Sequence, residues 1–417
     1  MKKFADNIDA TSTNQKLTFL FLLTYILLCV DAFGGALRYY FSLFNIESLL
    51  YIPKLLALVI SVFPFYIYNT TRRVGNYNFG VLLVYFVLAL SIWVAIYNSV
   101  AYSAIAFMFL ILAPFILGLR LPVPNNDQQK IILIFLFILW IITIGGIWAD
   151  YFIDFPWKGG EYELYGKTIE LSRSWTTIGI EMERPAGFTR MSGTASVYTG
   201  ALGIILLIHS RNIIIKILLI FITISTLIIT TTKSAIFAAI AVLLFLLFRP
   251  FVFMRIAILT LSLVFAIYLP LSSFSKNHEI SFDNEVSNMI FYSFDDRLSN
   301  TWPNYYSAIT HSFIGEGFGG VGTANNMYGS QLANQTLSIA DNFLLYLIGW
   351  FGFIFGICIF IWLGYSAYRF SSSKNRWYEA IGIAGIFILL VGITADVIET
   401  VSGGLLLGII AVGFKDS

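Results

Sequence analysis

Four basic residues of this 417-residue sequence stand beside long apolar runs, where a fixed positive charge could hold an anion. Arg184 and Arg190 lie in a polar segment that leads into an apolar run, Lys233 interrupts the apolar stretch 213–247, and a later polar segment contains Arg297. The planar fork of arginine suits bidentate binding of phosphate, and a lysine at membrane depth needs a wet cavity or a partner. The alternatives are that the arginines pair with nearby acids or lipid headgroups, and that Lys233 caps a helix and snorkels to the interface.

Two residues could accept a proton near these charges. Asp341 directly precedes an apolar run, together with Asn342, and a carboxylate there could act as a general base. His311, in the preceding polar segment, is the rival base. The alternative for Asp341 and Asn342 is a plain helix cap, because a helix N-terminus favours carboxylate and amide oxygens.

A glycine-rich segment follows Arg297 and Trp302. If the Arg297–Trp302 piece is helical, both side chains could face one side. Gly317 and Gly319 allow positive φ and close approach of the backbone, so exposed N–H groups could cradle an anion. The alternative is a turn with no special role. The same glycines match G-x-G-x-x-G, but that pattern indicates dinucleotide binding only between a strand and a helix of a βαβ unit.

The composition indicates which elements must position these residues. Hydrophobic residues make up 58% of the chain and charged residues 12%, and the mean hydropathy is +0.81. Apolar runs close to the roughly 20 residues of a membrane-spanning helix recur from end to end. The sequence therefore predicts an all-α polytopic membrane protein with about 12 transmembrane helices, forming a single integral membrane domain over 1–417. The predicted spans cover 17–34, 49–68, 78–97, 101–119, 131–149, 195–210, 213–231, 234–248, 254–271, 342–367, 379–396 and 399–415.

The charges orient these predicted spans. Each short segment on one side carries at least two basic residues, such as Arg72 and Arg73, which makes that side cytoplasmic by the positive-inside rule. Both termini then lie inside, and two long segments, 150–194 and 272–341, lie outside with most of the acidic residues. Their many aromatic residues argue against disorder, so we expect them to fold over the outer mouth of the bundle.

Other classes of function are excluded by what the sequence lacks. Cys29 and Cys358 lie far apart inside apolar runs, so we expect no disulfide framework. The histidines have no metal-ligand spacing, and no basic run is typical of nucleic-acid binding. We therefore expect no metal, no cofactor and no nucleic-acid partner.

In their order along the chain, these segments resemble the O-antigen ligase and polymerase superfamily over roughly residues 180–365. The segment 190–193 is similar to an arginine–glycine segment before a mid-chain span, and 232–235 to a Thr/Ser-Arg-small turn between two spans. The stretch 297–319 resembles an outer loop with Arg, then Trp, then His-Pro-x-x-Gly-x-Gly-x-Gly, and 340–342 stands where the family has Ala-His-Asn.

Three positions depart from the family pattern. Lys233 stands where arginine is usual, Ser312 replaces the proline, and Asp341 replaces the histidine that is believed to be catalytic in ligases. The last change favours the polymerase branch (Wzy-type).

The resemblance implies a GT-C-like membrane protein of the bacterial inner membrane, with its active site facing the periplasm between two large periplasmic loops. It implies metal-independent, inverting glycosyl transfer that polymerises undecaprenyl-pyrophosphate-linked repeat units into a surface polysaccharide, the O-antigen of lipopolysaccharide or a similar glycan. The acceptor would be a glycan or the lipid A core, and a chain-length regulator and a flippase would be partners. On this reading Asp341, Arg297, Arg190 and His311 are catalytic, and the residues that bind substrate are Arg184, Lys233, Trp302, Gly317, Gly319 and Asn342.

The chemistry of the residues agrees with that reading, because fixed cations offset charge on a departing pyrophosphate. The rivals are a ligase that moves finished glycan to lipid A core or protein, and a transporter or flippase of lipid-linked sugars. A transporter is expected to carry ionisable groups deep in several spans, whereas here the charges crowd the outer face. The sequence therefore favours an enzyme.

Overall fold

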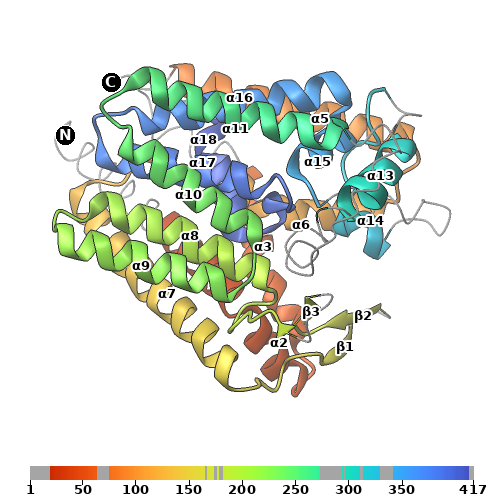
Figure 1. Cartoon of the computed structure of the whole chain (residues 1–417). Helices are drawn as coiled ribbons and strands as arrows, with labels where there is room; N and C mark the ends of the chain where they lie inside the picture. Colours follow the sequence, from red (N-terminus) through yellow and green to blue (C-terminus); the bar gives the residue numbers. More distant parts are fainter. Residues whose placement is uncertain are drawn as a thin grey trace, which may run out of the picture.

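The computed structural model is a bundle of helices with a small amount of strand at one end (Figure 1). It describes residues 19–62, 75–164, 167–172, 176–177, 182–272, 294, 296–309, 313–328 and 341–412. The predicted helical class agrees with this architecture. Four of the described helices are long and apolar enough to cross a membrane, or five if a bent pair is one span.

The helices occur close to the predicted runs. In the first half they are Phe19–Ala32, α2 (Gly34–Ser42), α3 (Ile52–Val62), α5 (Gly75–Tyr97), α6 (Tyr102–Gly118) and α7 (Asn126–Phe152). In the second half they are α8 (Ser192–His209), α9 (Ile213–Ile229), α10 (Lys233–Leu247), α11 (Val252–Ser272), α15 (Phe343–Phe351), α16 (Phe353–Ser371), α17 (Arg376–Val391) and α18 (Val401–Ala411). One predicted span, 17–34, ends at a sharp bend, and another is not a single straight helix. The chain bends by 79° between Phe19–Ala32 and α2, and Gly352, with φ 79°, separates α15 from α16 within predicted span 342–367.

Asparagine side chains begin several of these helices. Asn125 caps α7 in a capping box with Gln128, and Asn212 accepts the N–H of Ile214 at the start of α9. Asn375 accepts the N–H of Trp377 at the start of α17. Each cap satisfies a backbone donor that the first helical turn leaves open, so these apolar helices begin at defined residues.

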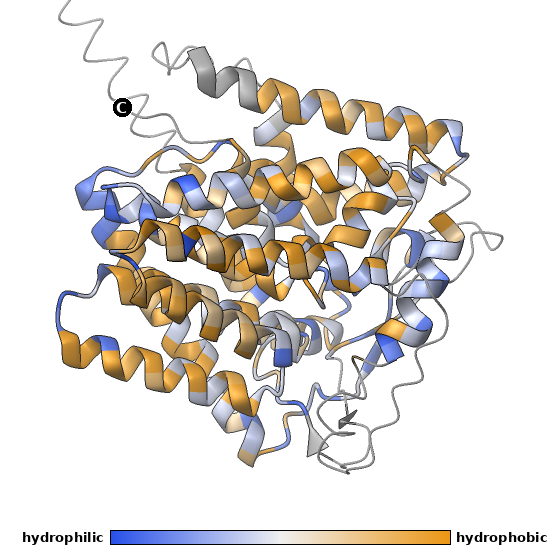
Figure 2. Ribbon diagram, turned by 45° about the horizontal axis from the view of Figure 1, so that its top comes forward, coloured by the Kyte–Doolittle hydropathy of each residue, from blue (hydrophilic) through white to orange (hydrophobic). Residues whose placement is uncertain are grey.

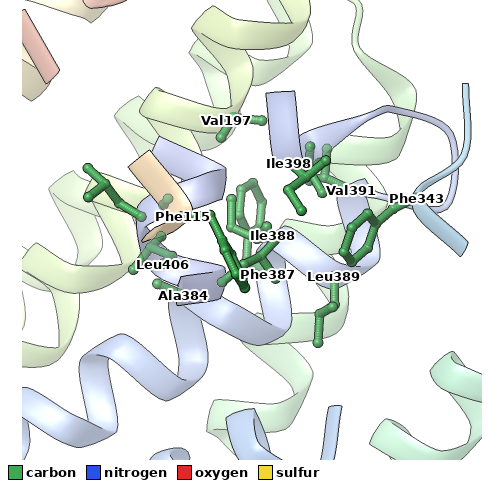
Figure 3. Close-up of a cluster of buried hydrophobic side chains, with 14 of the residues drawn as sticks. Phe115, Val197, Phe343, Ala384, Phe387, Ile388, Leu389, Val391, Ile398 and Leu406 are labelled. Carbon is green, nitrogen blue, oxygen red and sulfur yellow. The ribbon is translucent and has the colours of Figure 1, made fainter. Parts of the chain in front are cut away.

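Helix α17 lies at the centre of the bundle. It packs against α8, α10, α16 and α18, and every residue from Glu379 to Val391 is buried. Figure 3 shows Phe387, Ile388, Leu389 and Val391 of this region among side chains from other helices. Close packing depends on small residues: a Cβ added to Gly200 of α8 would overlap the ring of Phe387.

Exposed apolar side chains cover the outside of the bundle. They include Phe86 and Trp93 on α5, Ile134 on α7, Phe221 on α9 and Leu261 on α11. Hydrophobic residues dominate the shafts of these helices, and hydrophilic residues gather towards the helix ends (Figure 2). An apolar surface of this extent is typical of contact with lipid.

The two ends of the bundle differ. Short connections close one end, at 119–125, 210–212, 248–251 and 372–375. The other end, the loop end, carries β1 (Glu161–Leu164), β2 (Lys167–Glu170), β3 (Thr176–Thr177), β4 (Met182–Glu183), a π-helical turn (Arg297–Thr301), α13 (Trp302–Ile309) and α14 (Thr323–Tyr328) (Figure 1). Strands β1 and β2 pair antiparallel with Glu161 opposite Glu170, and β3 pairs antiparallel with β4. The all-α prediction missed these two small sheets.

Candidate functional site

An arginine and an aspartate from distant parts of the chain pair at the loop end. Arg297 Nη2 donates to Asp341 Oδ2 at 3.1 Å. The side chains of Arg297 and Asp341 are 21% and 40% exposed, so the pair is open to water on one side. Asp341 has φ 47°, in the left-handed region, where aspartate is tolerated better than most residues other than glycine. This conformation places the carboxylate immediately before α15.

Two further cations lie beside this pair. Arg184 and Lys233 are both within electrostatic range of Arg297, and of one another. Burial and the charge of Arg297 both lower the pKa of the Arg184 guanidinium. Together Arg184, Lys233 and Arg297 form a cluster that we call the α10 group, because Lys233 is the first residue of α10. The N-terminus of that helix adds the positive end of its dipole to the same place.

The turn between α9 and α10 holds Lys233 in position. Thr231 has φ 51° in this turn, and its N–H donates to the carbonyl of Ile228 at 3.0 Å. Ser196 of α8 donates to the hydroxyl of Thr230 at 3.0 Å. Because α8, α9 and α10 lie side by side (Figure 1), the start of α10 is fixed against two neighbours.

A second set of charges includes Arg190. The Nζ of Lys54 is within electrostatic range of Arg190, Arg38, Asp31 and Glu399. We call Arg38, Lys54 and Arg190 the α2 group, after the helix that carries Arg38. The placement of Arg190 and Arg297 in one catalytic site stays a prediction.

The segment that contains Arg184 and Arg190 is anchored from α7. Asp150, buried near the end of α7, accepts the N–H groups of Ala186 and Gly187 at 2.7 and 2.9 Å and pairs with Lys158 at 3.0 Å. Gly187 has φ 63°, and a Cβ there would overlap the backbone of α7. A buried carboxylate that accepts two backbone donors fixes a loop tightly, so this anchor sets where both arginines lie.

Two acids between α17 and α18 were missed by the sequence analysis. Asp396 accepts the backbone N–H groups of Asp341 and Asn342. Burial, Glu399 and Asp341, in that order, raise the pKa of Asp396 well above its ordinary value. Glu399 accepts the N–H and hydroxyl of Thr323 at 3.0 and 2.5 Å. The signal in the sequence was that acidic residues occupy both ends of this short junction, 396–399. Asp396 is within electrostatic range of Asp341, and Glu399 of Lys54.

Asn342 is a structural cap. Its side-chain oxygen accepts the N–H of Leu345 at 2.9 Å, and its Nδ2 donates to the carbonyl of Ile393 at 2.7 Å. The residue is 0% exposed. The prediction that Asn342 binds substrate is therefore corrected: both polar groups of its side chain are used within the protein.

The prediction that Trp302 binds substrate is also corrected. It is 0% exposed and packs edge-to-face on Phe294, with ring centroids 6.0 Å apart. The predicted helix at this point exists, but it turns Trp302 into the core, while Arg297 reaches Asp341. A fully buried indole has no free face for stacking on a sugar.

Gly317 and Gly319 serve packing. Their φ angles are 85° and 82°, as the glycine pattern predicts. A Cβ at Gly317 would overlap the backbone of Ala95 in α5, and one at Gly319 would meet the carbonyl oxygen of Ala104 at 2.9 Å. Both glycines are buried, so the prediction that they cradle a substrate anion is replaced by close contact with α5 and α6.

His311 lies outside the described residues, so Asp341 is the candidate base whose surroundings are defined. Among the described residues, no group of three His, Cys, Asp or Glu side chains could hold a metal ion. No protein-family model matches the sequence, and no curated protein matches it. The likeness to the O-antigen ligase and polymerase superfamily rests on its motifs alone.

Proposed function

We propose that this chain is a membrane glycosyltransferase that joins lipid-pyrophosphate-linked repeat units into a polysaccharide at the outer face of a bacterial cytoplasmic membrane. The observation that carries the proposal is the Arg297–Asp341 pair with Arg184 and Lys233 beside it. All four groups lie together. The carboxylate can take a proton, and the three cations can stabilise a phosphate leaving group. These are the two requirements of glycosyl transfer from a pyrophosphate-linked donor.

In the proposed reaction, the oxygen of an acceptor hydroxyl attacks the anomeric carbon of the donor. The bond between that carbon and the pyrophosphate oxygen breaks, and its electron pair stays on the pyrophosphate. Asp341 takes the hydroxyl proton on Oδ1 while Arg297 holds Oδ2, and the α10 group offsets the charge that develops on the leaving group. Attack opposite the leaving group inverts the anomeric centre.

The proposed orientation places the loop end outside the cell. The short connections at the opposite end carry basic residues, including Arg120, Arg211, Arg249 and Lys374, which is typical of the cytoplasmic side. Apolar helices of sufficient length and an exposed apolar surface support a membrane location. The proposed number of crossings stays at about 12, as the apolar runs predict.

The test is the surface glycan of a deletion strain complemented with single variants. Loss of chain length with one repeat unit retained supports a polymerase. Accumulation of lipid-linked polymer indicates a ligase instead, and repeat units held inside the cell indicate a flippase.

Arg297→Ala should give the deletion phenotype with normal amounts of protein in the membrane. Arg297→Lys should restore only part of the activity, because lysine keeps the charge but loses the bidentate fork. Lys130→Ala, which removes an exposed cation near the opposite end, is the matched control. If the Arg297→Ala variant gives surface glycan of wild-type chain length, the α10 group has no role in the reaction.

A further inference from the structure

The start of α15 is held by the junction between α17 and α18. The N–H of Phe343 donates to the carbonyl of Gly392 at 2.7 Å, and Asn342 Nδ2 donates to the carbonyl of Ile393 at 2.7 Å. A Cβ added to Gly392 would be 2.9 Å from the Cβ of Phe343, so the two segments lie in close contact. The junction therefore fixes the first residues of the helix that follows the candidate base.

Asp396 extends this hold to the candidate base itself. Its carboxyl group accepts the backbone N–H groups of Asp341 and Asn342. Asp341 has φ 47°, and a residue other than glycine stays in the left-handed region only where its surroundings determine it strongly. Backbone strain of this kind is concentrated at functional sites, and here it coincides with the residue that is proposed to take the proton.

The hold comes from the most deeply packed part of the protein. Every residue of α17 from Glu379 to Val391 is buried, and the junction begins directly at the end of this helix. Glu399, at the other end of the junction, accepts the hydroxyl of Tyr346 at 2.5 Å. Because Tyr346 lies in the first turn of α15, a second bond ties this helix to the same segment.

The side chain and the backbone of Asp341 are held from different sides. Arg297, in the π-helical turn, donates to Oδ2 of the side chain, whereas Asp396 accepts the backbone N–H. A single bond to Oδ2 does not fix the peptide unit that carries the side chain. With the N–H groups of residues 341 and 342 held as well, Oδ1 has a defined direction in which to accept a proton.

We propose that Asp396 is the positioning residue of the candidate base: by holding the backbone of residues 341 and 342, it directs the Asp341 carboxylate towards the acceptor hydroxyl. In this role Asp396 acts through Asp341 and takes no part in the proton transfer. The assignment rests on the proposed glycosyltransferase function and deepens it, because it names the group that sets the geometry of the base.

Two substitutions separate the bonds to the backbone from the rest of the Asp396 side chain. Asparagine keeps an oxygen for the two N–H groups, so kcat of Asp396→Asn in the turnover of a purified lipid-linked repeat unit should stay within about threefold of wild type. Asp396→Ala should lose about 10- to 10²-fold in kcat, because a shift of a reacting group by about 1 Å costs on the order of 10²-fold. In both variants KM for the donor should change by less than about threefold, because Arg184 and Lys233 stay in place to bind it.

A double variant tests whether Asp396 acts through Asp341. If it does, Asp341→Asn/Asp396→Ala should be no more than about twofold slower than Asp341→Asn alone, since the effects of groups that act as a unit are not additive. Thr400→Ala is the control for a lost structural bond at the same junction, because the Thr400 hydroxyl accepts the N–H of Gly403 at the start of α18. This control should lower the melting temperature without changing kcat.

Hydrogen exchange of the full chain in lipid nanodiscs gives a measurement that does not depend on turnover. The amides of residues 341 and 342 should exchange slowly in the wild type and in Asp396→Asn, and at least about 10-fold faster in Asp396→Ala. Thr400→Ala should leave both amides protected. If Asp396→Ala does not fold, Asp396→Glu replaces it: its carboxyl group lies one methylene further out, so this variant should also lower kcat and speed the exchange.

Several results would overturn the proposal. They are fast exchange of amides 341 and 342 in the wild type, wild-type kcat in Asp396→Ala, and a double variant in which the two losses multiply. A loss of kcat in Asp396→Asn equal to that in Asp396→Ala would do so too, because the acid itself rather than its bonds to the backbone would then be required.

The two measurements separate this proposal from the proposed function. A wild-type chain that polymerises nothing while amides 341 and 342 stay protected would reject the glycosyltransferase function and leave the hold of Asp396 on residue 341 standing. A chain that does polymerise, with kcat unchanged in Asp396→Ala, would reject only the positioning role.

Discussion

Asp341→Asn tests the proposed base directly. Asparagine also tolerates the left-handed conformation of residue 341 (φ 47°), and its carbonyl oxygen can still accept from Arg297. The substitution therefore removes the proton acceptor and the negative charge while keeping the backbone. Loss of a general base lowers the rate by about 10²- to 10⁴-fold, which is roughly 3–5 kcal/mol of transition-state stabilisation.

The cost in stability should be much smaller. The Arg297–Asp341 pair is partly exposed, with side chains 21% and 40% accessible, and exposed pairs contribute about 0–1 kcal/mol. Asp341→Ala would add about 1–2 kcal/mol, because alanine is strained in the left-handed region. The asparagine variant should therefore melt within a few degrees of the wild type, and the alanine variant should melt lower.

The assay is turnover of a purified lipid-linked repeat unit by protein in membranes, with a thermal melt of each variant. Asp127→Asn is the matched control, because Asp127 pairs with Lys130 at the same 3.1 Å near the opposite end of the bundle. A rate within a few fold of wild type in Asp341→Asn would refute the reasoning, since it would leave Asp341 only the role of holding Arg297. Inactivity of His311→Gln in the same experiment would then assign the base to His311.

Three further outcomes are expected. Gly317→Ala should lower the melting temperature and the yield of folded protein, because its Cβ would overlap the backbone of α5, whereas Gly193→Ala, with open space around its Cβ, should not. The folded protein binds the proton of Asp396 more tightly than the unfolded chain does, so wild-type stability should fall as pH rises from the ordinary carboxyl value of 3.8 through the raised pKa. Asp396→Asn should lack this loss, and its melting temperature relative to wild type should be higher at pH 7 than at pH 4. Cysteines introduced at Glu163 and Lys374 should react with an impermeant thiol reagent from opposite sides of the membrane. Labelling of both from one side would contradict the predicted membrane topology.

The helices could be predicted because each apolar run is long and ends in polar residues. Predicted span 213–231 corresponds to α9 (Ile213–Ile229) and 234–248 to α10 (Lys233–Leu247). The break at Gly352 was hidden, because α15 and α16 form one continuous apolar run in which a glycine can be tolerated. The two hairpins were hidden for a different reason, since short strands in a polar segment have no apolar period that distinguishes them from loop.

The candidate site was only partly predictable. Its cations could be identified by residue type, because a charged side chain beside an apolar run costs free energy unless it faces a wet cavity or a partner. Their grouping could not, because it depends on which helices are neighbours: Arg184 is within electrostatic range of Arg297, and Arg190 of Lys54. Trp302 and Asn342 were misassigned because a polar or aromatic type at a loop boundary does not show whether the side chain faces inward. Asp396 and Glu399 were missed because they stand at the ends of predicted spans 379–396 and 399–415, where residue type alone does not show which neighbours a side chain reaches.

The bond from Val401 to Asp31 has a consequence for how the protein is made. It joins the first described helix to the last across 370 residues, and Ser91 of α5 likewise donates to the carbonyl of Trp350 across 259. Chains are synthesised at about 5–20 residues per second, so Asp31 waits roughly 20 to 75 s for its partner to emerge. Helix α6, whose most extensive contacts are with α18, is inserted in the same interval without the surface that it packs against. Helix α6 must therefore remain without its main packing partner until the end of synthesis, and a ribosome that stops before α18 leaves that surface of α6 uncovered.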